Sequence, residues 1–331
     1  MSILAGDVGA THARLRLVRD AVDGPTIVRE ARLLSRDFNG LSTLLQTFLR
    51  PDDALQAVAL GIAAPVIDGN ARFTNLPWPN VSEAELQRLL QVPVRLLNDL
   101  EAMASGVLTI AERERHVLQA GTRREGPLAV IAPGTGLGQA IVWQAHGQTH
   151  VQATEGGHVD FAPQEDVDVA LWQFARAEWQ HVSWERVVSG PGLHVIWRCL
   201  TERLGEPACA GVQTAVETGA DVPAIIGQHG VSGACPSCGK AVRWLVRLLG
   251  AQAGNLALTV WSVGGVYLAG GLTEHLWPIL HEGPFLQAFQ AKGRYESVMR
   301  QMPVYALRDA ALALNGATQA GLTLARAGVG H

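Results

Sequence analysis

Twice in this chain an apolar segment runs into a glycine-rich turn and continues as a second extended segment. The first copy spans residues 3–18, with its turn at residues 9–11 and an alternation of apolar residues and arginines after it. The second copy spans residues 128–143, with its turn at residues 133–138. Such alternation is typical of a half-buried strand. We therefore predict two β-hairpins with glycine turns, the second an internal echo of the first.

These turns do not match the two best-known nucleotide-binding glycine motifs. A P-loop contains a lysine, and neither glycine cluster does. A dinucleotide-binding fingerprint opens a helix directly after its glycines, whereas strand-like residues follow both turns here. Tight hairpins need glycine in any case. The duplication, with a hydroxyl in each turn at Thr11 and Thr135, favours two backbone surfaces that hold a polyphosphate between them.

Residues near the turns extend this prediction. Asp7 precedes the first turn and offers a hard oxygen ligand for Mg²⁺ or its bound waters, although an Asp there could also cap the turn. A third apolar strand, at residues 266–269, ends at Gly270 and Gly271. Three strands that end in small residues predict three backbone surfaces lining one cleft.

A second group of polar residues suits a polyhydroxyl ligand. Asn98 and Asp99 follow a predicted strand, at the position where open α/β sheets bind ligands. Glu155, His158 and Glu185 lie in apolar or glycine-rich surroundings, and such side chains hydrogen-bond sugar hydroxyls. Taken singly, each residue also has a structural explanation as a helix cap, a core histidine or a surface ion pair.

The remaining segments indicate alternating strands and helices. Strands are expected at residues 57–63 and 92–97, and a helix begins at Ser82, whose spacing to Glu85 is that of a capping box. Further helices are expected over residues 100–107, 167–177, 193–203, 241–260 and 311–327. A charge-rich stretch at residues 106–125 suggests either a domain boundary or one exposed helix and loop. The polar, glycine-rich residues 205–239 are expected to be loose.

Composition excludes several classes of protein. The chain has 331 residues, 48% of them hydrophobic and 17% charged, which suits a folded protein of about two domains. Its net charge of −4 lacks the basic excess of a nucleic-acid-binding protein. No apolar run approaches the roughly 20 residues of a membrane-spanning helix, and we identify no signal peptide. With four cysteines, too few for a disulfide framework, a cytoplasmic location is expected.

Cys235 and Cys238 have the spacing of half a zinc site. A structural zinc site needs four ligands, the sequence contains no second Cys-x-x-Cys motif, and His158 is already assigned to the polyhydroxyl ligand. We therefore expect less than about one-tenth of an equivalent of zinc per chain.

Together the motifs resemble the bacterial glucokinase family of hexokinase-type enzymes. The Glu-Gly-Gly-His-x-Asp-Phe-Ala-Pro run at residues 155–163 is highly specific, and the resemblance covers nearly the whole chain in order and spacing. The other matching segments are residues 6–11, 74–78, 98–99, 134–138, 185–192, 268–271, 292–294 and 303–305. The first turn departs from the family pattern, because Ala10 and His12 stand where the family usually has Gly and Asn. With a Cβ, Ala10 is expected to avoid a positive φ.

The resemblance implies a duplicated ribonuclease-H-like α/β fold of the actin and hexokinase type, with two domains flanking a cleft. A small α/β domain would span residues 1–108 and a larger α/β domain residues 109–316. The C-terminal helix, at about residues 317–331, would return to the small domain. The assembly implied is a homodimer.

The resemblance also implies ATP-dependent phosphorylation of glucose to glucose 6-phosphate, with Mg²⁺ as cofactor. Asp99 would be the general base on the sugar 6-hydroxyl, and Asp7 would serve the metal. Glucose would be held by Asn98, Asp99, Glu155, His158 and Glu185. ATP would be held by Gly6, Asp7, Val8, Gly9, Ala10, Thr11, Gly134, Thr135, Gly136, Gly138, Gly270 and Gly271.

Two alternatives stay open. One is a kinase for another hexose or an amino sugar, as in the repressor and kinase family that shares this fold. Those kinases usually carry a cysteine-rich zinc motif soon after the Glu-x-Gly-His segment, and here no cysteine precedes Cys199. The other is a non-catalytic sugar-binding regulator of the same fold, against which Asp99 argues. We expect no helix-turn-helix ahead of the strand that begins at residue 3.

Overall fold

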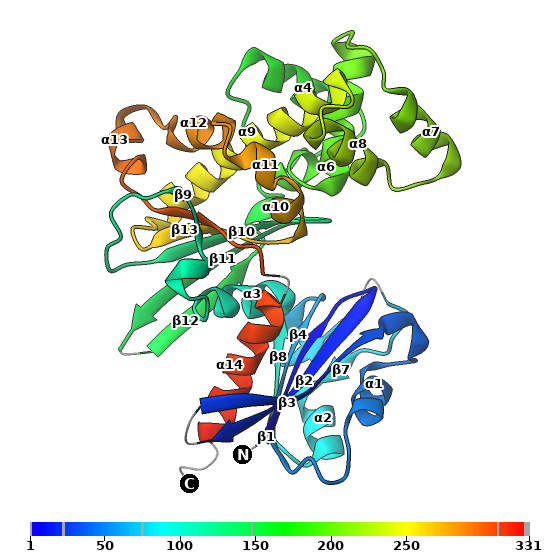
Figure 1. Cartoon of the computed structure of the whole chain (residues 1–331), viewed down its shortest axis with the longest axis vertical. Helices are drawn as coiled ribbons and strands as arrows, with labels where there is room; N and C mark the ends of the chain where they lie inside the picture. Colours follow the sequence, from blue (N-terminus) through cyan, green and yellow to red (C-terminus); the bar gives the residue numbers. More distant parts are fainter. Residues whose placement is uncertain (1, 22–23, 74–75, 147, 310, 328–331) are drawn as a thin grey trace. The chain divides into compact units, whose positions relative to one another are not determined.

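The structure is a computed structural model of the chain, and it describes all residues except 1, 22–23, 74–75, 147, 310 and 328–331. The chain divides into two compact units (Figure 1). Unit 1 comprises residues 1–111, 151–153 and 309–331, and unit 2 comprises residues 112–150 and 154–308.

Unit 1 is built on a five-stranded mixed sheet in the order β3-β2-β1-β4-β8. Its strands are β1 (Ser2–Val8), β2 (His12–Ala21), β3 (Gly24–Leu34), β4 (Leu55–Ile62) and β8 (Val94–Asn98). β1 and β2 form the first predicted hairpin, with Asp7 opposite Arg14. β1, β4 and β8 are parallel, so their carboxyl ends meet at one edge of the sheet.

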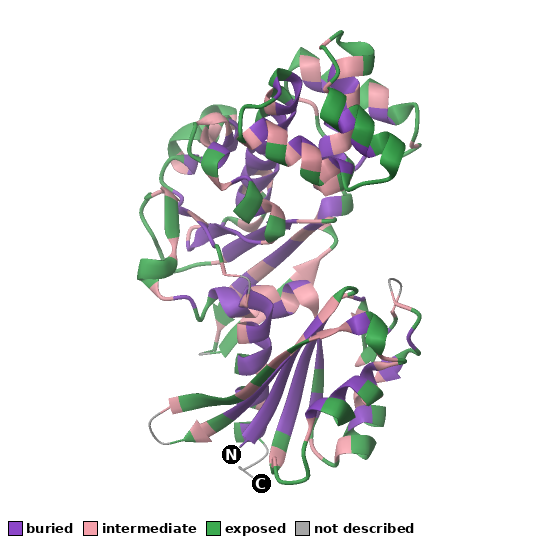
Figure 2. Ribbon diagram, turned by 45° about the vertical axis from the view of Figure 1, so that its right-hand side comes forward, coloured by how far each residue is buried: buried purple, intermediate pink, exposed green. Residues whose placement is uncertain are grey.

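Helices cover both faces of this sheet, whose central strands are largely buried (Figure 2). The helices of unit 1 are α1 (Leu41–Phe48), α2 (Glu83–Leu90), α3 (Asp99–Val107) and α14 (Leu312–Ala327). α1 and α2 pack on the face that carries Leu15 and Leu60, and α14 packs on the opposite face, against Ile3. A Cβ on Gly316 of α14 would lie 1.8 Å from the carbonyl oxygen of Ala102, so glycine is required where α14 meets α3.

The capping box predicted at the start of α2 is confirmed. The Ser82 hydroxyl accepts from the Glu85 amide at 3.2 Å, and the Glu85 carboxylate accepts from the Ser82 amide at 2.9 Å. A small three-stranded sheet precedes this helix, made of β5 (Val66–Ile67), β6 (Asn70–Ala71) and β7 (Val81–Ser82). Residues 74–75, part of one segment of the family resemblance, lie outside the described residues.

A six-stranded mixed sheet, in the order β12-β11-β10-β13-β14-β9, belongs to unit 2 except for residues 151–153 of β12. The strands are β9 (His116–Gln119), β10 (Leu128–Pro133), β11 (Leu137–Ala145), β12 (Gln148–Thr154), β13 (Gly265–Leu268) and β14 (Val304–Ala306). β10 and β11 form the second predicted hairpin, and β10, β13 and β14 are parallel. The core of each unit is therefore a sheet with parallel strands at its centre.

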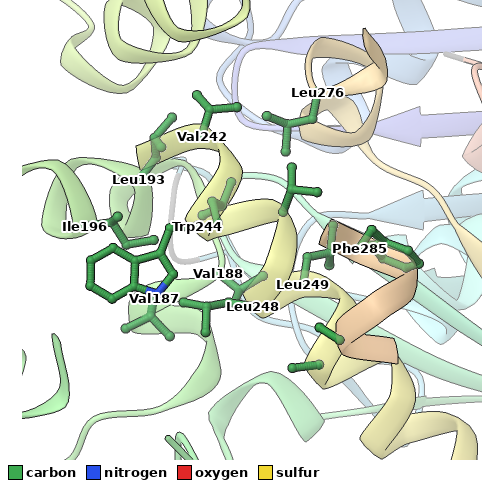
Figure 3. Close-up of a cluster of buried hydrophobic side chains, with 14 of the residues drawn as sticks. Val187, Val188, Leu193, Ile196, Val242, Trp244, Leu248, Leu249, Leu276 and Phe285 are labelled. Carbon is green, nitrogen blue, oxygen red and sulfur yellow. The ribbon is translucent and has the colours of Figure 1, made fainter. Parts of the chain in front are cut away.

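Several helices of unit 2 pack against α9 (Pro236–Val260). Its Trp244, Leu248 and Leu249 lie among apolar side chains from neighbouring helices (Figure 3). The other helices are α4 (Asp166–Arg176), α5 (Trp184–Val187), α6 (Gly190–Arg198), α7 (Ala210–Thr218), α8 (Val222–Val231), α10 (Gly271–His275), α11 (Trp277–Leu280), α12 (Pro284–Gln290) and α13 (Glu296–Met299). None of the helices in the described residues combines the length and apolar character needed to cross a membrane.

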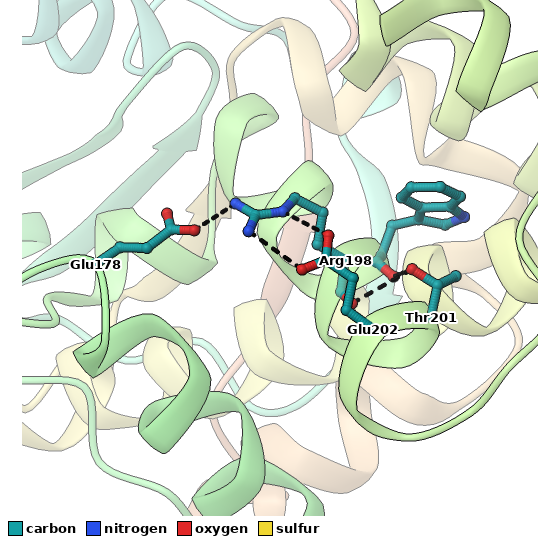
Figure 4. A network of polar contacts seen from close by, with 5 residues as sticks. Glu178, Arg198, Thr201 and Glu202 are labelled. Atoms are coloured by element: carbon teal, nitrogen blue, oxygen red, sulfur yellow. Dashed lines mark hydrogen bonds and ion pairs between the residues drawn. The ribbon is translucent and has the colours of Figure 1, made fainter.

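The structure differs from expectation in two helical regions. Residues 205–239 are not loose, because they contain α7, α8 and the first turn of α9. The helix expected over residues 193–203 is α6 followed by a π-helical turn, Cys199–Arg203. At this junction Arg198 binds Glu178 and Glu202, and the Thr201 hydroxyl donates to the carbonyl of Trp197 at 3.1 Å (Figure 4).

Candidate functional site

In unit 1, Asp7, Asn98 and Asp99 all lie at the carboxyl ends of the parallel strands. Asp7 is next to the last residue of β1, and Asn98 is the last residue of β8. β4 separates them, with Gly61 opposite Asp7. A Cβ on Gly61 would lie 2.7 Å from the Cβ of Ala102, so this glycine lets α3 begin close to the strand ends.

The pKa of Asp7 is raised at this edge. Burial raises it most, the charge of Arg14 lowers it and the charge of Asp99 raises it, and the net pKa is about 6. Burial and a like charge disfavour the ionised form of Asp7, and a bound cation would favour that form. The oxygen chemistry of Asp7 and its position beside the first glycine turn therefore fit Mg²⁺.

The first glycine turn is held in place by Ser35, a residue that no sequence motif identified. The Ser35 hydroxyl donates to the carbonyl of Gly9 at 2.7 Å, and its amide donates to the carbonyl of Thr11 at 3.1 Å. Ser35 is fully buried and begins a 3₁₀-helix directly after β3. Ala10 and Thr11 are exposed at the tip of the turn, and Ala10 does not have a positive φ, as expected for a residue with a Cβ.

Asn98 rather than Asp99 occupies the cap position of α3. The side-chain oxygen of Asn98 accepts from the Leu100 amide at 3.0 Å, and its nitrogen donates to the carbonyl of Ala64 at 3.2 Å. Asp99 is the first residue of the helix, half-buried, and one of its carboxylate oxygens also accepts from the Leu100 amide, at 2.9 Å. The helix therefore does not depend on Asp99 alone for its cap.

In unit 2, the glycine turn at residues 134–138 lies against the N-terminus of α6. The amide of Gly190 donates to the carbonyl of Gly134 at 2.8 Å, and Ser189 caps the helix by accepting from the Gly192 amide at 3.1 Å. Thr135 is exposed at the tip of the turn. Backbone N–H groups and the positive end of a helix dipole are the usual components of an anion site.

The fold brings together Glu155, His158 and Glu185, the three sugar-binding candidates of unit 2. The ring Nε2 of His158 lies 3.7 Å from a carboxylate oxygen of Glu155 and 3.9 Å from one of Glu185. Backbone hydrogen bonds join the segments that carry them: the Trp184 amide donates to the carbonyl of Val159 at 3.1 Å. The result is a cluster of two carboxylates and an imidazole in which Glu155 and His158 are exposed and Glu185 is half-buried.

Two glycines place the segment that carries Glu155 and His158 directly on β11. A Cβ on Gly157 would lie 2.1 Å from the carbonyl oxygen of Leu137, and one on Gly156 would lie 2.4 Å from the side-chain oxygen of Gln139. The Glu-Gly-Gly-His run therefore has glycines because its backbone packs against the strand that follows the glycine turn. Gln139, which is buried, was not identified from the sequence.

Gly270 and Gly271 follow β13. Because β13 is parallel to β10, they lie at the same edge of the unit 2 sheet as the glycine turn at residues 134–138. Gly270 has a φ of +84°, and a Cβ there would lie 2.7 Å from the carbonyl oxygen of Pro133 at the end of β10. Among the described residues, apart from its chain neighbours and the backbone of α10, no heavy atom lies within 4 Å of the Cβ position of Gly271. The backbone at this point is both close to β10 and open on its other side.

The predicted residues thus form two groups, each at the carboxyl ends of the parallel strands of its own sheet. Unit 1 carries Gly6, Asp7, Val8, Gly9, Ala10, Thr11, Asn98 and Asp99. Unit 2 carries Gly134, Thr135, Gly136, Gly138, Glu155, His158, Glu185, Gly270 and Gly271.

Comparison with known proteins identifies the family. The family model described as glucokinase matches residues 4–323. A glucokinase from Chromobacterium violaceum is 36% identical over 317 residues, which is 95% of this chain and 87% of that protein. The crystal structure of a glucokinase from an Antarctic psychrotroph has a TM-score of 0.83 at 28% identity, over 97% of this chain and 99% of that one.

The fold is shared more widely. A ROK-family glucokinase from Streptomyces griseus, solved in complex with glucose and AMPPNP, has a TM-score of 0.64 at 18% identity over 98% of this chain and all of that one, a likeness of fold alone. The predicted α/β fold class, with its two mixed sheets, is confirmed by these likenesses.

Proposed function

This chain belongs to the glucokinase family and is a hexose kinase, and we propose that it transfers the γ-phosphoryl group of ATP to the 6-hydroxyl of glucose, with Asp99 as the general base. One observation carries the proposal: Glu185 contacts both kinds of predicted site. One of its oxygens accepts from the Leu137 amide, beside the glycine turn, at 2.9 Å. The other lies 3.9 Å from His158. A sugar bound by this cluster would lie next to a backbone surface suited to phosphate.

In this proposal the sugar is held by side chains and the phosphates by backbone. Glu155, Glu185 and Asn98 accept hydrogen bonds from sugar hydroxyls, and His158 adds an imidazole nitrogen. The glycine turns at residues 9–11 and 134–138, with the N-terminus of α6, surround the phosphates with N–H groups. Phosphoryl transfer depends mainly on positioning and on stabilisation of spread negative charge, so these groups supply what the reaction needs.

In this proposal Asp99 accepts the proton of the sugar 6-hydroxyl. As the sugar oxygen forms its bond to the γ-phosphorus, the hydroxyl proton passes to the Asp99 carboxylate. The bond between the γ-phosphorus and the bridging oxygen breaks, and ADP leaves. Such general-base assistance typically accelerates a reaction ~10²- to 10⁴-fold.

Asp7 is proposed to hold Mg²⁺ or its bound waters. The ion, when bound, neutralises charge on the ATP phosphates. Asp7 itself would bind in its ionised form, which the cation favours over the neutral form that burial promotes. We further propose a homodimeric assembly, which rests on the family resemblance.

A coupled ADP-release assay tests the substrate. We expect glucose to give the highest kcat/KM in a panel with mannose, fructose, galactose and N-acetylglucosamine, with a sugar-free reaction as the control for ATP hydrolysis. Equal or better use of another hexose would overturn glucose as the substrate and leave the kinase activity intact. ADP formation that no sugar stimulates would contradict the proposal as a whole.

A further inference from the structure

Three metal-ligating side chains converge in unit 2 at a place that the proposed reaction does not use. The sulfurs of Cys209 and Cys238 and a ring nitrogen of His229 all lie within 4.8 Å of one another. Cys209 Sγ is 3.3 Å from His229 Nδ1. The three residues come from three helices: the N-cap of α7, the last turns of α8 and the first turn of α9.

A fourth donor adjoins this group. Cys235, the N-cap residue of α9, precedes Cys238 by three residues, and its sulfur lies 3.3 Å from the hydroxyl oxygen of Ser237. The amide of Cys235 also donates to the carbonyl of His229 at 3.4 Å. Three thiols and one imidazole form the Cys₃His set, one of the standard ligand sets of structural zinc sites.

The spacing of the donors suits a tetrahedral ion. With Zn–S bonds of about 2.3 Å and Zn–N bonds of about 2.0 Å, neighbouring donors in such a site lie roughly 3.5 to 3.8 Å apart. Cys209 Sγ and His229 Nδ1 are 3.3 Å apart, and these two atoms and Cys238 Sγ all lie within 4.8 Å of one another. Cys235 does not belong to this close group. Three donors are thus close to their coordinating positions, and rotation of the Cys235 side chain away from Ser237 would bring in the fourth.

Two glycines allow the three helices to meet at this point. A Cβ on Gly211 of α7 would lie 2.6 Å from the ring of His229, and one on Gly230 of α8 would lie 2.6 Å from the carbonyl oxygen of Cys238. The side chains that α7 buries are small in number and size, Val212 and Ala215. A helix with so little apolar contact gains much from a metal link to its neighbours.

We propose that Cys209, His229, Cys235 and Cys238 form a structural zinc site that ties α7 and α8 to the start of α9. On binding, the three thiols release their protons to solvent and His229 coordinates as the neutral imidazole, so three thiolates and one nitrogen surround the ion. The expectation of almost no zinc is thereby replaced. It considered a second Cys-x-x-Cys motif and His158 as sources of further ligands, but neither Cys209 nor His229.

Elemental analysis of the full-length protein, purified without chelators or a metal-affinity tag, is the first test. We expect about one equivalent of zinc per chain, and loss of most of it in Cys209→Ser and in His229→Ala. Cys199→Ser is the matched control, because Cys199 is buried in the π-helical turn outside this cluster, and it should retain the zinc. Less than about one-tenth of an equivalent, even after incubation with excess zinc and desalting, would overturn the proposal.

A second test uses wild-type protein alone, in case the variants fail to fold. Zinc is removed with a chelator under reducing conditions and replaced by Co²⁺, whose absorption spectrum should show tetrahedral thiolate coordination. Hydrogen exchange should increase in α7 and α8 on metal removal and return to its original level with zinc. Unchanged hydrogen exchange would overturn the proposal. So would protein that is free of zinc before any chelator treatment and that mass spectrometry shows to carry a disulfide between Cys235 and Cys238.

Discussion

At the scale of single residues, the proposed chemistry depends most on Asp99. Asp99→Asn should lower kcat at least about a hundredfold, because the amide cannot take the hydroxyl proton. Stability should change little, since Asn98 occupies the cap position of α3 and an Asn at position 99 could still accept from the Leu100 amide. Steady-state ADP release and thermal unfolding measure the two effects.

Asp221→Asn is the matched control for this substitution. Asp221 caps α8 by accepting from the Ala224 amide at 3.1 Å and has no role in the proposed reaction. Its variant should keep wild-type kcat. If folded Asp99→Asn keeps more than about a tenth of wild-type kcat, Asp99 supports the helix only and the proposed base is wrong.

The raised pKa of Asp7 predicts that the stability of the protein depends on pH. The pKa of Asp7 in the folded protein, about 6, is above the ordinary value of 3.8. The folded state therefore binds the proton more tightly than the unfolded state, and the stability that this contributes is lost as pH rises from about 4 to 6. Asp7→Asn, which is neutral throughout, should be more stable than wild type at pH 8 by about 1–3 kcal/mol and nearly equal at pH 4.

Urea unfolding of both proteins at the two pH values, without Mg²⁺, measures this difference. Comparing the two proteins at each pH cancels the contributions of other titrating groups. A stability difference that stays the same at pH 4 and pH 8 would show that burial of Asp7 does not penalise its charge.

At the scale of elements, α4 is joined to α9 by one buried carboxylate. Asp168, fully buried in the first turn of α4, accepts from Trp244 Nε1 at 2.8 Å and from Arg247, both on α9. It also accepts from the amides of Gln164 and Glu165 at 3.1 and 3.2 Å. Both carboxylate oxygens of Asp168 accept hydrogen bonds. An amide side chain has only one acceptor oxygen, so Asn cannot make all of these bonds.

Asp168→Asn should therefore destabilise the protein by at least about 2 kcal/mol, because it leaves the Arg247 charge without its buried partner. Glu296→Gln is the matched control: it removes an exposed i,i+4 pair with Arg300 on α13 and should cost less than about 1 kcal/mol. Urea unfolding of the two variants at one pH measures both. Equal effects would mean that the buried network contributes no more than a surface pair.

Elements whose signals are local were predictable. The two hairpins and the capping box of α2 depend on residues close together in the sequence, and the structure confirms them. The prediction of a loose region at residues 205–239 was wrong for a physical reason. Its many glycines are typical of a loop, but Gly211 and Gly230 lie within helices. Gly211 leaves room for the ring of His229, and Gly230 leaves room for the backbone of Cys238.

At the scale of the whole molecule, each unit repeats one arrangement: a sheet with central parallel strands, whose carboxyl ends carry the candidate residues. Unit 1 is completed by α14, the last helix, which packs against β1, the first strand. Within it Arg16 of β2 donates to Asn315 of α14 at 2.7 Å, across almost the full length of the chain. No local pattern in the sequence indicates that bond.

The sequence by itself determined the fold class, the two glycine turns and the family, because alternation, turn residues and motif spacing act over a few residues. Tertiary structure alone decided which distant residues meet. Ser35 holds the turn at Gly9, Glu185 reaches the amide of Leu137, and Cys209 joins His229 only after sheets and helices have packed. Such contacts depend on how closely two packed segments approach each other, and glycines permit a closer approach than large side chains do. That packing exists only in the folded chain.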